Sequence, residues 1–270
     1  MIPQFDKNKI RLHFSSAAPN YDKASVAQRQ SADNLLEAAL ALPHSPRRII
    51  DVGCGTGYAS YKLKSLFPAA SLVSLDMAYG MLSHAKKRFG QSGSFNGICG
   101  DAENLPFKSG SADLIFTNAA IHWCNQIEQT LVGFRQVLKP GGYLLGAAFG
   151  SGTLREINRA WETVDPERID AHRHKFPGIS DWAKLLPEGE WEALSLEAKF
   201  ITLYFPDTRE ALDSIRRAGA KNALTGKQKS LTGKKLFFRF LSELEKLREP
   251  KGIPLTYEVI YFKAVKPRRE

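Results

Sequence analysis

The sequence has few cysteines and no long apolar run. Only three cysteines occur among 270 residues, and Cys54, Cys99 and Cys124 lack the paired spacing of metal ligands. This pattern favours a reducing cytoplasm and predicts no bound metal. No run of about 18 apolar residues occurs, so we expect no transmembrane helix. Residues 1–11 are mixed and charged, without the apolar core of a signal peptide.

Acidic residues are scarcer than basic ones, with 28 Asp and Glu against 38 Lys and Arg and a net charge of +10. The segment Arg216–Arg239 contains basic residues and not one acidic residue. Such a balance favours an acidic partner, namely nucleic acid, an anionic surface or an acidic protein. The plain alternative is a solvated helix face followed by a loop.

Strand and helix patterns alternate in the first part of the chain. An apolar stripe predicts helical structure over residues 9–42. Strands are then expected at 49–52, 71–75, 95–99, 112–118 and 143–149, and helices at 58–67, 80–89 and 127–138. This alternation predicts a parallel sheet with helices on both faces.

The second part of the chain reads differently. Residues 151–199 are predicted to be mostly helical, 200–205 a strand, and 207–220 and 232–248 helices. Residues 254–265 alternate apolar and polar side chains and predict a closing antiparallel strand at the sheet edge. We therefore expect an α/β fold, doubly wound, with a mostly parallel seven-stranded sheet and an antiparallel edge strand. One domain, 1–270, would comprise an N-terminal helical cap (1–46), a ligand-binding core (47–150), a helical insertion after the fifth strand (151–199) and C-terminal strands and basic helices (200–270).

The most informative motif is the glycine-rich segment Asp51–Gly57, between a strand and a helix. Such a turn brings a nucleotide-like ligand to bare backbone N–H groups. Asp76 ends the next strand, where a carboxylate can accept hydrogen bonds from both hydroxyls of a ribose. Asp101 and Ala102 end the third, where they can meet the amine and ring nitrogen of adenine. A structural explanation, in which the glycines only form a tight turn, is the alternative.

The same segment lacks the Lys-Ser/Thr pair of a P-loop, which excludes that phosphate site. A leading acid would repel pyrophosphate but suits a cationic amino-acid ligand. The motif resembles the D/E-x-G-x-G-x-G of class I S-adenosylmethionine-dependent methyltransferases, which have a Rossmann-like fold. Asp101–Phe107 and Leu138–Gly142 resemble two further motifs of that class. The resemblance implies S-adenosylmethionine as cosubstrate, bound by Asp51, Gly53, Cys54, Gly55, Gly57, Asp76, Met77, Asp101, Ala102 and Asn118.

The flanks resemble a narrower family, the malonyl-[acyl-carrier protein] O-methyltransferases of biotin biosynthesis. The similar segments are 9–28, 118–124, 152–165 and 254–259. The resemblance implies methyl transfer to the free carboxylate of a malonyl thioester, giving the methyl ester that primes pimeloyl synthesis. The acidic acyl carrier protein would dock on Arg216–Arg239, and neither a membrane nor a nucleic acid would be a partner.

A malonyl carboxylate is ionised at neutral pH, so this reaction needs no general base. Its pocket requires polar groups and a cation that hold the carboxylate while leaving it nucleophilic. The predicted catalytic residues are Tyr21, His122, Arg155 and Lys175, the last standing in for an arginine of the family. Arg173 is an alternative cation.

Two other functions remain open at this point. A quinone or lipid methyltransferase would need a base, and His122 could serve. An RNA-binding methyltransferase would use the basic segment, although Asn118–Ile121 stands where base N-methylation usually has Asn-Pro-Pro-Tyr. The preference for carrier protein or coenzyme A, the oligomeric state and a lid role for the N-terminal helix are also left open.

Overall fold

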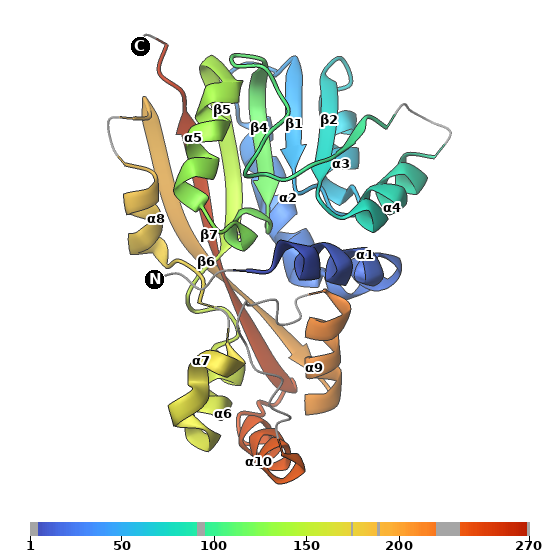
Figure 1. Cartoon of the computed structure of the whole chain (residues 1–270), viewed down its shortest axis with the longest axis vertical. Coiled ribbons are helices and arrows are strands. Elements are labelled where there is room, and N and C mark those ends of the chain that lie inside the picture. The colour runs from blue at the N-terminus through green and yellow to red at the C-terminus, as the bar shows by residue number, and fades with distance from the viewer. Residues whose placement is uncertain (1–4, 91–94, 174, 188–189, 220–232, 269–270) are drawn as a thin grey trace.

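A mixed sheet forms the centre of the molecule (Figure 1). The computed structural model describes residues 5–90, 95–173, 175–187, 190–219 and 233–268. In this part of the chain the sheet has seven strands in the order β3-β2-β1-β4-β5-β7-β6, and β7 and β6 are antiparallel. The fold class expected from the sequence is therefore confirmed. The strands are β1 (Arg48–Val52), β2 (Ser71–Asp76), β3 (Gly97–Cys99), β4 (Ala112–Asn118), β5 (Leu138–Phe149), β6 (Ala193–Phe205) and β7 (Ile253–Val265).

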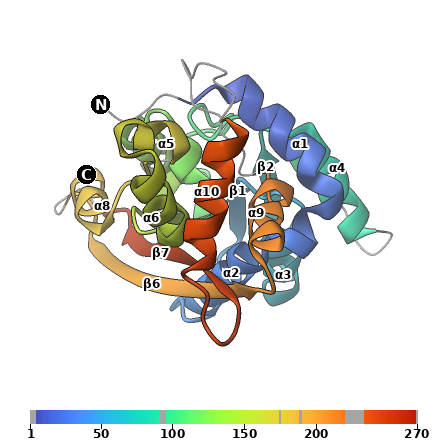
Figure 2. The ribbon, with the colours of Figure 1, turned by 90° about the horizontal axis from the view of Figure 1, so that it is seen from below.

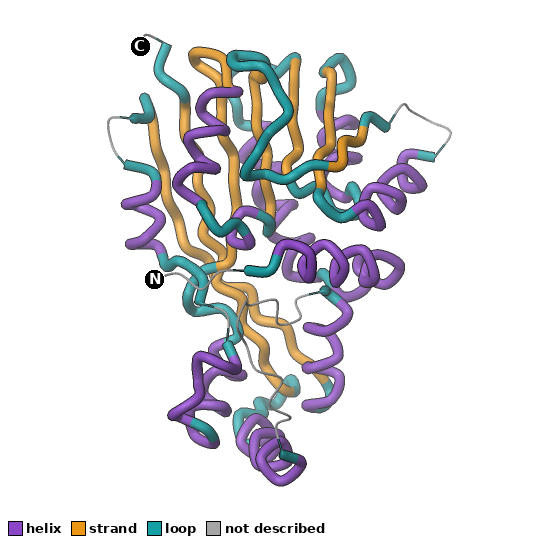
Figure 3. Tube along the Cα trace, viewed as in Figure 1, coloured by secondary structure: helices purple, strands orange, loops and turns teal. Residues whose placement is uncertain are grey.

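Helices cover both faces of the sheet (Figure 3). One apolar cluster joins α2 and α3 to the sheet, and a second joins α5 and α8 to the opposite face. None of the helices in the described ranges is long and apolar enough to span a membrane. The α-helices are α1 (Lys7–Ala24), α2 (Val26–Leu40), α3 (Tyr58–Leu66), α4 (Tyr79–Phe89), α5 (Ile127–Val137), α6 (Arg155–Val164), α7 (Ile169–His172), α8 (Ile179–Leu185), α9 (Thr208–Arg217) and α10 (Lys234–Glu245).

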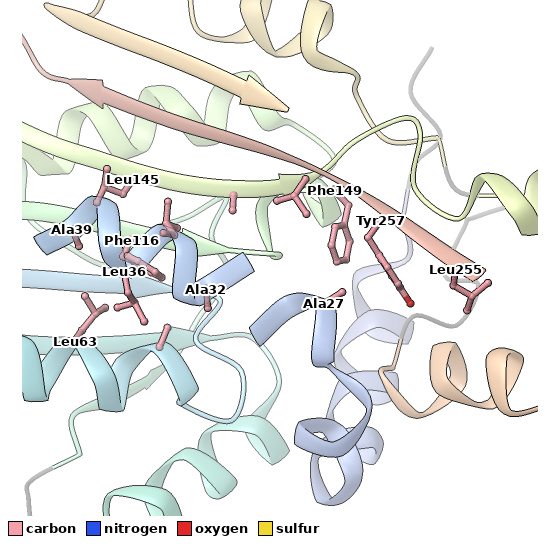
Figure 4. Close-up of a cluster of buried hydrophobic side chains, with 14 of the residues drawn as sticks. Ala27, Ala32, Leu36, Ala39, Leu63, Phe116, Leu145, Phe149, Leu255 and Tyr257 are labelled. Carbon is pink, nitrogen blue, oxygen red and sulfur yellow. The ribbon is translucent and has the colours of Figure 1, made fainter. Parts of the chain in front are cut away.

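The packing of α2 follows from its apolar stripe. Leu36 and Ala39 lie against Phe116 and Leu145 of the sheet, as Figure 4 shows. Full burial of a leucine-sized side chain contributes about 1.5–3 kcal/mol. This packing holds the N-terminal helices next to the carboxyl ends of the parallel strands.

Two expectations about the last strands are wrong. The strand predicted at 254–265 does not form the edge: β7 lies between β5 and β6. Strand β7 is paired with β5 along one edge and with β6 along the other, and its side chains are buried on both faces along most of its length. The edge strand β6 begins at Ala193, inside the segment 151–199 that we expected to be helical, because Leu194, Leu196 and Ala198 alternate toward the core.

Strands β6 and β7 pair along their whole length, from Ala193 opposite Val265 to Phe205 opposite Ile253. Their far ends extend beyond the parallel strands into a second layer (Figure 1). Seen from below, α6, α9 and α10 lie side by side in this layer (Figure 2). Helix α1 crosses between the layers, beneath the carboxyl ends of β1 and β2.

Candidate active site

The glycine-rich turn after β1 needs glycine for two reasons. Gly53, Gly55 and Gly57 have φ values of +74°, +55° and +76°, a region that other residues avoid. A Cβ on Gly53 would also lie 2.2 Å from the Cβ of Ala120, and one on Gly57 would lie 2.8 Å from that of Ala85. The glycines therefore allow close approach as well as a tight turn.

Asp76, at the end of β2, is held by the same turn. Its carboxylate accepts hydrogen bonds from the backbone N–H of Gly55 at 2.9 Å and of Ala78 at 2.7 Å. Burial raises the pKa of Asp76 to about 6, against the lowering effect of these two bonds. The carboxylate is thus fixed in place and suited to a ligand that supplies positive charge or hydroxyl donors.

Asp51, in β1, is more deeply buried, with 1% of its surface exposed. It accepts a hydrogen bond of 2.5 Å from the Ser60 hydroxyl. Burial, with a smaller contribution from the charge of Asp76, raises the pKa of Asp51 to about 7 against the lowering effect of the hydrogen bond from Ser60. Two carboxyl groups with raised pKa values, on the neighbouring strands β1 and β2, mark a candidate functional site.

A cavity of about 620 Å³, the cofactor cavity, opens beside these groups. Helix α1 covers it with Lys7, Ile10, Phe14 and Tyr21. Of the predicted cofactor residues, Gly53, Gly55, Asp76, Met77, Asp101, Ala102 and Asn118 line it.

A smaller cavity, the second cavity, adjoins it behind the glycine turn. The predicted residues Asp51 and Cys54 line this second cavity together with Gly53, Gly55 and Asn118. Gly57 lines neither cavity, and its role is to form the turn. The structure thus brings the predicted cofactor residues together around two adjoining cavities.

Asp101 is tied to the covering helix. Lys7 of α1 lies 3.1 Å from the Asp101 carboxylate and 2.7 Å from that of Glu103. Further along, Gly80 of α4 lies so close to α1 that a Cβ there would come within 2.6 Å of the carbonyl oxygen of Ser15. These contacts hold α1 over the cofactor cavity. We did not predict Lys7 from the sequence.

Arg29 of α2 is a second residue that the sequence analysis missed. It lines the second cavity, opposite Asp51 and Gly55. Its Nε is buried and has no hydrogen-bond partner among the described residues. An unpaired buried guanidinium nitrogen is costly unless a ligand supplies an acceptor. The only indication in the sequence was that Arg29 directly follows the segment 9–28, which resembles the family.

A third cavity of about 520 Å³, the acceptor cavity, adjoins the cofactor cavity at Phe14, Tyr21, Ala119 and Trp123. Ala119 and Leu154 both line it, with φ values of +51° and +56°. They are the only non-glycine residues in the described ranges with a left-handed backbone. Such strain costs roughly 1–3 kcal/mol and tends to occur at functional sites.

Tyr21 lines the cofactor, second and acceptor cavities, and Tyr257 of β7 lines the acceptor cavity. Burial raises the pKa of both phenols well above their usual range, and the charges of Asp76 and Asp22 add to the effect at Tyr21. Both groups therefore stay protonated at neutral pH and can donate hydrogen bonds.

His122 is 2% exposed and lies behind the cavity wall rather than in it. Its Nδ1 accepts a hydrogen bond of 3.2 Å from the backbone N–H of Phe149, so a neutral ring carries its proton on Nε2. The ring packs against Phe149 and Phe176, with centroids 5.0 and 4.7 Å away. His122 thus supports two aromatic residues that line the acceptor cavity.

The two predicted cations do not reach the acceptor cavity. The Arg155 side chain is 62% exposed and lies over the ring of Phe200. The Lys175 side chain is 47% exposed and pairs with Asp170 at 2.6 Å. Helix α6 and the segment before Phe176 present these long side chains to solvent, where their charges are hydrated.

The C-terminal motif around Thr256 fixes the acceptor cavity from behind. Glu156 accepts hydrogen bonds from the Thr256 backbone N–H at 2.9 Å and hydroxyl at 2.6 Å. Glu258 accepts one from the backbone N–H of Gly152 at 2.6 Å. The segment after β5, including Leu154, is thereby attached to β7, and Tyr257 lies between the two attachment points with its ring beside that of Phe149 (Figure 4).

The strand order, the glycine turn and the acids at the ends of β1 and β2 and after β3 define a class I, Rossmann-like S-adenosylmethionine-dependent methyltransferase. A family model described as a methyltransferase domain matches residues 50–146. The YcgJ protein from Bacillus subtilis superposes with a TM-score of 0.62 at 16% identity, covering 88% of this chain and 98% of that one. The plantazolicin methyltransferase BpumL in complex with SAH superposes with a TM-score of 0.54 at 17% identity, covering 97% and 96%. At these identities the two superpositions establish the fold.

Sequence relatives specify the family. A malonyl-[acyl-carrier protein] O-methyltransferase from Gallionella capsiferriformans is 35% identical over 97% of this chain and 91% of its own length. One from Xylella fastidiosa is 36% identical over 98% and 90%. The chain belongs to the malonyl-[acyl-carrier protein] O-methyltransferase family, as the sequence motifs indicated.

Proposed function

We propose that this enzyme transfers the methyl group of S-adenosylmethionine to the free carboxylate of a malonyl thioester on acyl carrier protein. The product would be the malonyl methyl ester that primes pimeloyl synthesis on the way to biotin. The observation that carries the proposal is the acceptor cavity, which adjoins the cofactor cavity at Tyr21. The names and nearly full-length similarity of the relatives support it.

The cofactor orientation follows from the charges around its two cavities. Asp76 would accept hydrogen bonds from the ribose hydroxyls, and Asp101 with Ala102 would hold the adenine. Asp51 and the glycine turn would face the amino-acid part, whose ammonium is cationic. Arg29 would bind the carboxylate of that part, because its Nε is the buried donor of the second cavity.

The methyl transfer itself needs little help from acids or bases. A carboxylate oxygen attacks the methyl carbon, the carbon–sulfur bond breaks, and its electron pair leaves with sulfur as a neutral thioether. Because opposite charges are neutralised, a water-poor cavity favours the reaction. Tyr21 and Tyr257 would orient the carboxylate through their hydroxyls, and His122 would act as a positioning residue through Phe149 and Phe176.

This arrangement revises two of the predicted roles. We no longer propose Arg155 or Lys175 as the group that holds the carboxylate, since neither lines the acceptor cavity. The cofactor sulfonium supplies the positive charge in their place. We also propose that no metal takes part, because an ionised carboxylate is already a nucleophile.

We propose that acyl carrier protein docks on the basic segment Arg216–Arg239. The described part of this segment comprises Arg216 and Arg217 of α9 with Lys234, Lys235 and Arg239 of α10. Lys221, Lys227 and Lys229 lie outside the described residues. An acidic carrier would be steered to this surface at low ionic strength.

We propose that residues 1–270 act as one methyltransferase domain, with 1–46 as a cap and the region after β5 forming the acceptor side. The cytoplasm is the compartment we propose. The thiols of Cys54, Cys99 and Cys124 are all free, in keeping with a reducing environment.

An acceptor assay tests the proposal. Purified enzyme is given S-adenosylmethionine with malonyl-acyl carrier protein, malonyl-coenzyme A or a quinol precursor, and methyl esters are detected by mass spectrometry. We expect the methyl ester on a malonyl thioester and none on the quinol. Methylation of the quinol alone would contradict the proposal and favour the small-molecule alternative.

A further inference from the structure

A fourth cavity, the outer cavity, continues the path that leads away from the cofactor. It occupies about 860 Å³ among α6, α7, α9 and α10. Four residues line both this cavity and the acceptor cavity: Thr153, Leu154, Phe176 and Ile215. A series of adjoining cavities therefore runs from the glycine turn to the second layer of the molecule, where α6, α9 and α10 lie side by side (Figure 2).

The inner wall of the outer cavity is flat and apolar. Trp161 of α6 is stacked between the ring of His172, 3.8 Å away, and the ring of Phe240, 4.2 Å away. His172 is held by Asp165 at 2.8 Å. Such a wall can pack against a narrow, uncharged ligand chain.

The rim of the outer cavity carries positive charge. Arg216 of α9 lines it with a side chain that is 60% exposed, and this side chain pairs with Asp213 on the same helix at 3.1 Å. Arg173 also lines it, but the carboxylates of Glu162 and Asp170 both lie within 3.4 Å of that guanidinium. An exposed pair such as Arg216–Asp213 is weak, so Arg216 can exchange its partner for an anionic ligand at little cost.

We propose that the outer cavity holds the prosthetic arm of the carrier protein, an amide-bearing aliphatic chain, and that Arg216 binds the phosphodiester at its far end. This inference rests on the proposed function. The order of environments supports it: phenols beside the cofactor, then an apolar passage, then an arginine at the rim. The phosphopantetheine arm has the matching order, with its thioester at one end, a neutral chain and a phosphate where it joins the carrier.

The phosphate contact can be tested without the carrier protein. Malonyl-phosphopantetheine and malonyl-pantetheine differ only in the phosphate, and their KM values are measured for the wild type, Arg216→Ala and Arg209→Ala. Arg209 is an exposed arginine of α9 that lies outside both the outer cavity and the docking segment. Loss of a charge-assisted hydrogen bond should raise KM about tenfold or more.

We expect this increase only for Arg216→Ala and only with the phosphorylated compound. An equal increase with both compounds, or no increase with either, would overturn the assignment of Arg216.

Chemical labelling tests the position of the arm itself. Asn158 of α6 is partly exposed and lines the outer cavity, so Asn158→Cys should react with iodoacetamide. Labelling of that peptide is followed by mass spectrometry in the presence of apo-carrier protein, which lacks the arm, or holo-carrier protein, which has it. We expect protection by the holo form alone, with Arg209→Cys protected by neither.

Equal labelling of Asn158→Cys with both carrier forms would overturn the inference. The proposed function has a separate readout, the methylation of malonyl-acyl carrier protein by the wild type. Methylation with equal labelling would remove only the arm site, and protection without methylation would remove only the proposed reaction.

Discussion

At the scale of single residues, the two carboxyl groups that we propose bind the cofactor, Asp51 and Asp76, are buried, and burial destabilises their charged forms. Asp51 and Asp76 have pKa values raised to about 7 and about 6 by burial. A raised pKa means that the folded state keeps a proton which the unfolded chain loses. The stability of the cofactor-free protein should therefore fall as pH rises from about 4 to about 7, and the cationic ligand should restore it.

The change Asp51→Asn separates these two effects. Asparagine cannot ionise, so we expect the cofactor-free variant at pH 8 to melt higher than the wild type by roughly 2–4 °C, the shift that about 1 kcal/mol makes in a domain of this size. The same variant should bind S-adenosylmethionine much more weakly by calorimetry. A lower melting temperature with undiminished affinity would contradict both parts.

Arg29 gives a second prediction at this scale. We expect Arg29→Ala to weaken S-adenosylmethionine binding about tenfold or more, the effect of losing a charge-assisted hydrogen bond of about 1.5–3 kcal/mol. Arg11→Ala, at an exposed position of α1, is the matched control and should bind normally. Binding that falls equally in both variants, or in neither, would remove Arg29 from the site.

At the scale of elements, α1 covers the cofactor cavity with Lys7, Ile10, Phe14 and Tyr21. A Cβ on Gly80 would lie 2.6 Å from the Ser15 carbonyl oxygen and 2.8 Å from its Cα, so α4 and α1 meet backbone to backbone. Lys7 adds ion pairs to Asp101 and Glu103 at the N-terminal end of α1. We infer that α1 is positioned by contacts at its N-terminal end and at its middle.

A pair of glycine substitutions tests this seating. We expect Gly80→Ala to push α1 away, weaken cofactor binding and speed amide exchange in α1. Gly133→Ala, in α5, meets nothing within 4 Å and should instead stabilise the protein by up to about 1 kcal/mol, through helix propensity. Tight cofactor binding by Gly80→Ala would show that α1 is not positioned by this contact.

The elements also show where sequence patterns were sufficient. Strands β1, β2 and β4 were predicted within one residue of their observed bounds, because each is an apolar run bounded by a turn. Strand β3 begins two residues later than predicted, and β5 begins at Leu138 rather than at residue 143. The two antiparallel strands were misjudged. Alternation in β7 suggested an exposed edge, but its second face is covered by α6 and α9 and its second side by β6.

At the scale of the whole molecule, charge is distributed unevenly. The described basic residues of α9 and α10 lie in the second layer, on the far side of α1 from the five parallel strands (Figure 1). A charged surface beside the outer cavity would raise the rate of association with an acidic carrier and lose this effect at high salt.

Charge reversal on α10 tests the docking of the carrier protein separately from the binding of its prosthetic arm. Lys234 and Lys235 do not line the outer cavity, and we expect their double change to glutamate to raise KM for malonyl-acyl carrier protein severalfold at low salt. KM for malonyl-pantetheine should stay constant. The control is the change of Lys86 and Lys87 of α4 to glutamate, which alters the net charge of the protein by the same amount. A similar rise in KM for both substrates would contradict docking on this surface.

The sequence by itself determined the cofactor side of this protein. Asp51, Gly53, Asp76 and Asp101 lie at the ends of strands and in tight turns, and their places follow from local backbone geometry once a parallel sheet is recognised. Tertiary structure decided the acceptor side. Its cavity is built from α1, the end of β4, the segment after β5, α9 and β7, which meet only in the folded chain. Tertiary packing therefore determines that Arg155 and Lys175 point into solvent and that His122 lies behind the wall of the acceptor cavity. It also determines that Arg29 lines the second cavity.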